Sequence, residues 1–180
     1  VLVFVQMTNE EISTRSVAGL LAKNHLYFNS QRVSPESLEF VKHMILPALS
    51  FSDTVLRNVA SQIVAVLMQV LKPANWIEGL SSLTQAMDSS HTEEAEAALS
   101  TFAKISEDMP EELDACEIQG MRPLDVLIPK LLQATAHADT RIRVHALNSL
   151  NQYIQIGSPS MNANMDGYIA VLFQRATDER

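Results

Sequence analysis

The chain has 180 residues, a formal net charge of -8 at pH 7 and a hydrophobic fraction of 47%. Its five glycines and 6% aromatic residues leave little material for a turn-rich sheet protein, and the apolar content excludes intrinsic disorder. The negative charge argues against direct binding of nucleic acid and allows basic proteins as partners. The single cysteine, Cys116, excludes an internal disulfide and a cysteine-based zinc site.

Membrane insertion and export are not expected. No apolar run approaches the roughly 18 residues of a membrane span, and the start has no basic leader of a signal peptide. Residues 1–7, VLVFVQM, are apolar on nearly every side and are interpreted as the tail of a helix. We therefore expect a soluble excerpt of a longer protein.

The first half of the chain predicts amphipathic helices with recognisable starts. Thr8 and Glu11 have the spacing of a capping box. The helix that follows is expected to bury Ile12, Val17, Leu20, Leu21 and Leu26. Ser34 and Pro35 start a second helix and Asp53 starts its partner.

The next helices are predicted on either side of residue 90. Pro73 ends the preceding helix, and Asn75 starts one in which Trp76 is a packing residue. Ser90 and Glu93 form another possible capping box. Residues 109–121 show no clear period, so we expect a longer connection there.

The clearest helical pair spans residues 122–154, RPLDVLIPKLLQATAHADTRIRVHALNSLNQYI. Each half has one apolar stripe at helical spacing. Asp139 is a good N-cap, and its charge can meet that of Arg143 on one helix face. After Gly157 a break precedes one more helix.

A repeat is visible in the arginine spacing. Arg15 and Arg57 lie 42 residues apart, and Arg57 and Arg143 lie 86 apart, or twice 43. This period is typical of HEAT or armadillo repeats, and two helices per unit favour HEAT. The predicted fold is all-α, an alpha-alpha superhelix (HEAT-repeat solenoid) of about four repeats. It forms one segment, with approximate repeats 1–28, 34–71, 75–109 and 122–156 and the start of a further repeat at 160–180.

The sequence contains no constellation typical of catalysis. It has no glycine-rich phosphate loop, nucleophile elbow or metal-binding His-Glu-x-x-His helix, and its five histidines are scattered. We expect no enzyme activity, no catalytic or metal-ligating residue and no cofactor. The eight methionines are interpreted as core filling rather than as an adaptable groove.

Charge provides the first candidate for binding. Residues 88–117 carry ten of the 21 acids against the single Lys104. This run is either a solvated face or a landing surface for a basic protein, with Glu94 and Asp108 as candidate contacts.

The second candidate is a polar stripe opposite the apolar one on each second helix. An amide-rich face can hydrogen-bond a partner at a lower desolvation cost than a charged one. Since any surface helix is polar on one side, an ordinary solvated face remains the alternative. The residues of the two stripes are Asn58, Gln62 and Gln69 on the earlier helix, and Arg141, His145, Asn148, Gln152 and Gln155 on the later one.

Three segments, in order, resemble the N-terminal repeats of the importin-beta (karyopherin-beta) family: RSVAGLLAKNHL, NWIEGLSSL and the 122–154 segment quoted above. The resemblance implies a nuclear import receptor that shuttles between cytoplasm and nucleus through the nuclear pore. It also implies that second helices line a concave face, which receives the small GTPase Ran in its GTP form. Nucleoporins and nuclear-localisation-signal cargo would bind through the full-length receptor. The alternative is a HEAT scaffold or regulatory subunit of another complex, such as that of a phosphatase or kinase.

Overall fold

The computed structural model describes residues 1–176 and divides into two compact units, Val1–Ile105 and Ser106–Arg180. Among the described residues every regular element is a helix, and an isolated bridge joins Ile118 to Met121. The α-helices are α1 (Leu2–Val5), α2 (Ile12–Asn29), α3 (Pro35–Ile45), α4 (Thr54–Leu71), α5 (Ile77–Ala86), α6 (Thr92–Asp108), α7 (Pro110–Asp114), α8 (Pro123–Ala134), α9 (Thr140–Gln155), α10 (Pro159–Asn162) and α11 (Met165–Arg175). Short 3-10 helices are η1 (Ser30–Arg32), η2 (Leu46–Ser50) and η3 (Pro73–Asn75).

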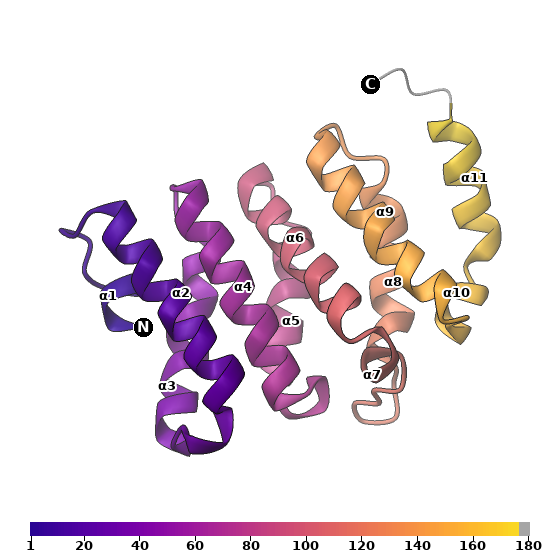
Figure 1. Ribbon diagram of the computed structural model, residues 1–180. Coiled ribbons are helices and arrows are strands. Elements are labelled where there is room, and N and C mark those ends of the chain that lie inside the picture. Colours follow the sequence, from indigo (N-terminus) through magenta and orange to yellow (C-terminus); the bar gives the residue numbers. More distant parts are fainter. Residues whose placement is uncertain (177–180) are drawn as a thin grey trace. The chain divides into compact units, whose positions relative to one another are not determined.

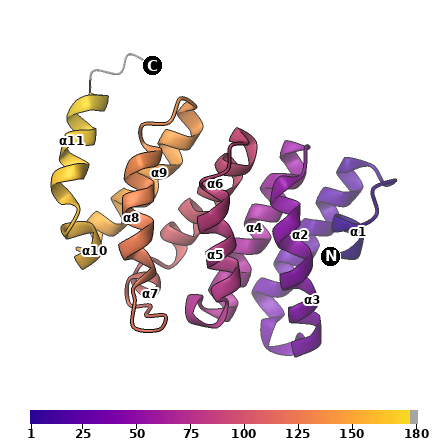
Figure 2. The same ribbon diagram turned by 180° about the vertical axis from the view of Figure 1, so that it is seen from behind.

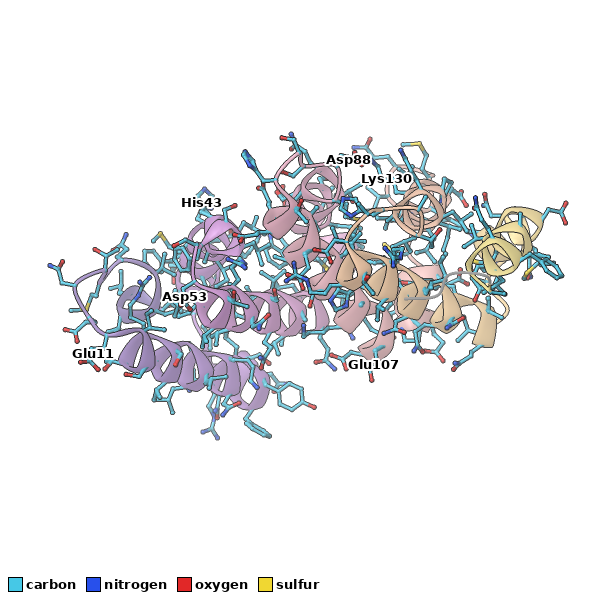
Figure 3. All side chains as sticks on the ribbon, turned by 90° about the horizontal axis from the view of Figure 1, so that it is seen from above. Glu11, His43, Asp53, Asp88, Glu107 and Lys130 are labelled. Atoms are coloured by element: carbon cyan, nitrogen blue, oxygen red, sulfur yellow. The ribbon has the colours of Figure 1, made fainter. Side chains whose placement is uncertain are left out.

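The first unit consists of two layers of helices. The second helices α2, α4 and the first part of α6 lie side by side, with the first helices α3 and α5 behind them (Figure 1), and the opposite view shows the same two layers (Figure 2). Seen from above, His43 and Asp88 lie along the edge formed by the first helices, whereas Glu11 and Asp53 lie at the starts of α2 and α4 (Figure 3). Successive helical pairs arranged in this way confirm the predicted HEAT fold.

Helix α4 is the centre of the first unit. Its predicted N-cap is confirmed, because the Asp53 carboxylate accepts hydrogen bonds from the main-chain N–H groups of Val55 and Leu56 at 2.9 and 3.0 Å. Residues 54–71 are long and apolar enough to span a membrane by length and composition, contrary to the expectation from the sequence. However, 56% of that window is buried inside the protein, as in a core helix.

The predicted buried face of α2 is wrong except at Leu26. The other four predicted residues are exposed, and the helix instead turns Arg15 and Gly19 inward. A Cβ atom at Gly19 would lie 2.4 Å from Val59 Cγ1 and 2.7 Å from Phe4 Cδ2. Because α2 packs along α4 this closely, the glycine side of the helix is the one that fits. The exposed residues are Ile12, Val17, Leu20 and Leu21.

The two capping boxes predicted from sequence do not form as expected. Helix α2 begins after Glu11, whose side chain makes no cap hydrogen bond. At the start of α6, Ser89 rather than Ser90 accepts the His91 N–H, at 3.1 Å. A capping box requires backbone geometry that the sequence spacing alone does not guarantee.

The start of α5 also differs from the prediction. The residue before the helix is Trp76, which makes no side-chain cap and is buried. Asn75 instead donates from Nδ2 to the Leu71 carbonyl oxygen at 2.9 Å, at the end of α4. The packing role expected of Trp76 is confirmed.

The second unit is built on the pair α8 and α9. Helix α10 contacts both, and α11 packs against α8. The connection predicted for residues 109–121 contains a short helix, α7, which packs on α8 and α9. A buried hydrogen bond of 2.9 Å joins the hydroxyls of Ser106 and Tyr153, and burial raises the pKa of the tyrosine.

Candidate functional site

Arginine side chains fix the turns that lead into the second helices. Arg57 donates from Nη1 to the main-chain oxygens of Phe51 and Ser52, both at 2.7 Å, and from Nη2 to Thr54 Oγ1 at 3.1 Å. Its Nη1 also lies 3.3 Å from Glu93 Oε2. The guanidinium satisfies these oxygens in the turn and thereby fixes where α4 begins.

The turn before α9 has the same construction. Arg143 donates from Nη1 to the main-chain oxygens of His137 and Ala138, at 3.0 and 2.8 Å, and from Nη2 to Thr140 Oγ1 at 3.0 Å. Asp139 caps the helix, as predicted, by accepting the Arg141 N–H at 2.8 Å. Hydrogen bonds from the Arg141 side chain and main chain lower the pKa of Asp139 from 3.8 to about 2.

The polar stripe of α4 is only partly free for a partner. Asn58 is exposed, whereas Gln62 and Gln69 are half-buried. Lys23 on α2 donates to Gln62 Oε1 at 3.3 Å, so this amide already joins two helices of the first unit. Of the predicted contacts on α4, Asn58 is therefore the most accessible.

The stripe of α9 has a larger exposed surface. Arg141 and Asn148 are exposed, and His145 and Gln152 are half-buried. Their spacing of four, three and four residues places all of them on one helix face. Arg141 is held by Asp139, whose Oδ2 lies 2.8 Å from Nη2. The face presents amides and one oriented cation.

The acidic run divides among several local structures. Glu93 pairs with Arg57, and Asp114 Oδ1 accepts a hydrogen bond from the Ser158 hydroxyl at 2.6 Å. The two candidate contacts lie at opposite ends of α6. Glu94 is half-buried in the first turn, and Asp108 is exposed at the last residue, so the two side chains are not neighbours.

Glu94 lies instead in a groove of the first unit. The groove has a volume of about 640 Å³ and lies between η2 and the end of α5. Its walls include Leu46, Ser50, Ala86 and Asp88. The lining residues come from two stretches that are distant in the sequence, 46–50 and 82–94, so the sequence carried no spacing signal for the groove. Ser50, which hydrogen-bonds Glu94 from the other stretch, was missed for this reason, and Ser89, five residues before Glu94, was also missed.

Metal and thiol chemistry receive no structural support in the described part of the chain. Within residues 1–176, no group of three or more His, Cys, Asp or Glu side chains is placed to hold a metal ion. Cys116 is buried, and desolvation raises the pKa of its thiol, which disfavours the nucleophilic thiolate.

Sequence comparison identifies relatives along nearly the whole chain. Transportin-1 of Oryza sativa subsp. japonica is 35% identical over 98% of the chain, and importin subunit beta-2 of Schizosaccharomyces pombe is 30% identical over 98%. Human transportin-1 is 30% identical over 99% of the chain. The chain is a homologue of the transportins, in the importin-beta family. Within that family, the order of the three segments quoted above favours transportin, and the comparisons confirm it.

The chain matches only part of the length of each relative. The chain spans 20% of the length of each of these transportin relatives. No family model matches the sequence. The crystal structure of an engineered protein is similar to 99% of the chain and 71% of its own, with a TM-score of 0.60 and 16% identity, which supports the helical fold alone.

Proposed function

We propose that this chain is a segment of a nuclear import receptor and contributes to a surface that binds Ran in its GTP form. The observation that carries the proposal is the continuous similarity to the transportins over 98–99% of the chain. The role of the whole receptor, including shuttling through the nuclear pore with nucleoporins and cargo, is part of the same proposal.

The second helices supply the surfaces through which the segment would act. Asn58 is exposed on α4, and Arg141 and Asn148 are exposed on α9. Amides can accept and donate at once, and an arginine already oriented by Asp139 loses less side-chain freedom on binding. Such faces are suited to bind a small GTPase whose surface carries both hydrogen-bond donors and acceptors.

The segment would act by binding and not by catalysis. Bound nucleotide would belong to Ran, because the sequence has no phosphate-binding loop. The absence of enzyme activity is part of the proposal.

The test is a binding measurement with Ran loaded with GTP or GDP. The intact receptor containing this segment should bind the GTP form at least ten-fold more tightly. Replacing Asn148 and Gln152 by alanine should weaken the GTP complex without changing the melting temperature. Equal affinity for the two nucleotide forms would contradict the proposal.

The second candidate is a HEAT scaffold or regulatory subunit of another complex. It is supported only by the fold, which the engineered protein shares at 16% identity. A pull-down from cell extract that recovers a stable kinase or phosphatase subunit and no Ran would favour it.

A further inference from the structure

Two exposed residues of α2, Leu20 and Tyr27, stand at repeat positions that hold amides in other second helices. The repeat spacing of 42 residues aligns Leu20 with Gln62 and Tyr27 with Gln69 on α4. The positions 86 residues further along, on α9, are again amides, Asn148 and Gln155. Helix α2 therefore replaces a polar pair with an aliphatic and an aromatic side chain on the solvent side.

The other exposed apolar residues of α2 have a different origin. By the same spacing, Val17 and Leu21 align with Val59 and Ile63, which are buried in α4. Apolar side chains at these two positions are therefore expected from the repeat itself. The repeat gives no such reason for Leu20, which is 36% exposed, or for Tyr27, which is 53% exposed. Exposed apolar groups without a packing role are typical of binding surfaces.

A hydrogen bond between helices places these two residues beside the polar stripe of α4. Lys23 Nζ donates to Gln62 Oε1 at 3.3 Å. Leu20 lies three residues before Lys23 and Tyr27 four residues after it, so all three share one face of α2. Helices α2 and α4 lie side by side in one layer (Figure 1). Leu20 and Tyr27 thus border the α4 stripe, in which Asn58 is exposed.

The tyrosine ring is held in place before any partner binds. Its ring packs edge-on against that of Phe28, with the centroids 5.0 Å apart. Such a contact restricts the side chain, which reduces the entropy lost on binding. Tyrosine is also among the residues that most often dominate the affinity of a protein interface.

We propose that Leu20 and Tyr27 are the apolar anchor of the partner-binding face of the first unit and pack against a cluster of apolar side chains on the partner. The inference rests on the proposed function, because the partner is the Ran–GTP that the second helices would bind. Removal of the apolar surface from water supplies affinity, whereas the neighbouring amide of Asn58 orients the partner by directional hydrogen bonds. The matching surface of the partner is then apolar at its centre and polar at its rim.

The test is the affinity of the intact receptor for Ran loaded with GTP, measured by isothermal titration calorimetry. Leu20→Ala and Tyr27→Ala should each weaken the complex about ten-fold. Tyr27→Phe keeps the ring and should retain the affinity of the parent. Phe40→Ala, which removes a 43% exposed aromatic ring from α3 in the other layer, is the matched control and should have no effect.

Two further measurements separate an apolar contact from other causes. The fold-loss in the alanine variants should be the same at about 0.1 M and about 0.5 M salt, because neither side chain carries a charge. The melting temperatures should equal that of the parent, since both positions are exposed.

The outcomes distinguish this inference from the proposal on which it rests. If Ran–GTP binds the parent and both alanine variants equally well, the anchor is wrong and the proposed function stands. An equal loss in Phe40→Ala, or a loss in Tyr27→Phe as large as in Tyr27→Ala, would also overturn the apolar anchor. If the parent does not bind Ran–GTP, the proposed function and the anchor are both wrong.

Discussion

Arg57 and Arg143 bind equivalent sets of oxygens in two turns that are far apart in the sequence. Each guanidinium donates to the main-chain oxygens six and five residues before it and to the threonine hydroxyl three residues before it. The 86-residue spacing that indicated a repeat therefore reflects a shared structural task. In each turn, the arginine joins the connecting segment to the second helix of its pair.

Replacing either arginine by methionine should lower the free energy of unfolding by about 2–4 kcal/mol, because two main-chain oxygens and a threonine hydroxyl lose the donor that a buried guanidinium supplies. Urea denaturation followed by circular dichroism measures the change. Lysine should recover only part of the loss, since one ammonium lacks the planar fork that serves three acceptors. A methionine variant as stable as the parent would show that the arginine hydrogen bonds do not stabilise the turn.

Gly19 and Gly167 provide a matched pair of helical glycines. Gly19→Ala should destabilise the chain by about 1–3 kcal/mol, because the new Cβ would lie 2.4 Å from Val59 Cγ1. Gly167→Ala should be neutral or stabilising by up to about 1 kcal/mol, because its nearest neighbour is Leu132 Cδ1 at 3.5 Å and alanine favours the helix. Thermal unfolding of the two variants checks the contrast, and equal effects would contradict the close approach of α2 and α4.

The two faces of α2 should respond differently to truncation. Leu26 is 3% exposed and Leu21 is 65% exposed. Leu26→Ala should cost about 2–4 kcal/mol through the cavity it leaves, whereas Leu21→Ala should change stability by less than about 0.5 kcal/mol. Chemical denaturation of both variants measures the two losses of stability. A larger loss at Leu21 would contradict the exposed position of its side chain.

Asp139 should make the stability of the chain depend on acid. Its pKa in the folded protein, about 2, lies below the usual value of 3.8 because Arg141 hydrogen-bonds the charged carboxylate. The stabilisation is therefore present above about pH 4 and is lost as the pH falls toward 2. Asp139→Asn keeps a good N-cap and removes the charge, so its unfolding free energy should vary less between pH 4 and pH 2. Urea denaturation at several pH values in this range measures the unfolding free energy of both proteins. Equal dependence on pH in the two would show that the Asp139–Arg141 pair is not the cause.

The α9 stripe should contribute to binding and little to folding. Asn148→Ala combined with Gln152→Ala should weaken the Ran–GTP complex about ten-fold. Gln133→Ala on the exposed side of α8 serves as the control and should leave affinity unchanged. Surface plasmon resonance with the intact receptor measures both. Equal affinities of the double variant and the control would exclude this face from the interface.

The sequence by itself determined the class of fold and most of the buried positions. Wherever one side of a helix is apolar and the other polar, as in α4 and α9, periodicity alone indicates the inward face. Leu56, Ile63 and Leu150 on the apolar sides of these helices are buried. The repeated aspartate and arginine similarly indicated where second helices begin.

Only the tertiary structure decided the orientation of α2 and the existence of the groove. Helix α2 has large apolar residues on its exposed face, so hydrophobicity could not choose between its sides, and the choice follows from the small volume of Gly19 against Val59 and Phe4. The groove depends on two stretches that are distant in the sequence, 46–50 and 82–94, and Ser50 of the first hydrogen-bonds Glu94 of the second. Periodicity indicates which residues are buried. The packing of one helix against another and the shape of a groove depend also on residues that are distant in the chain.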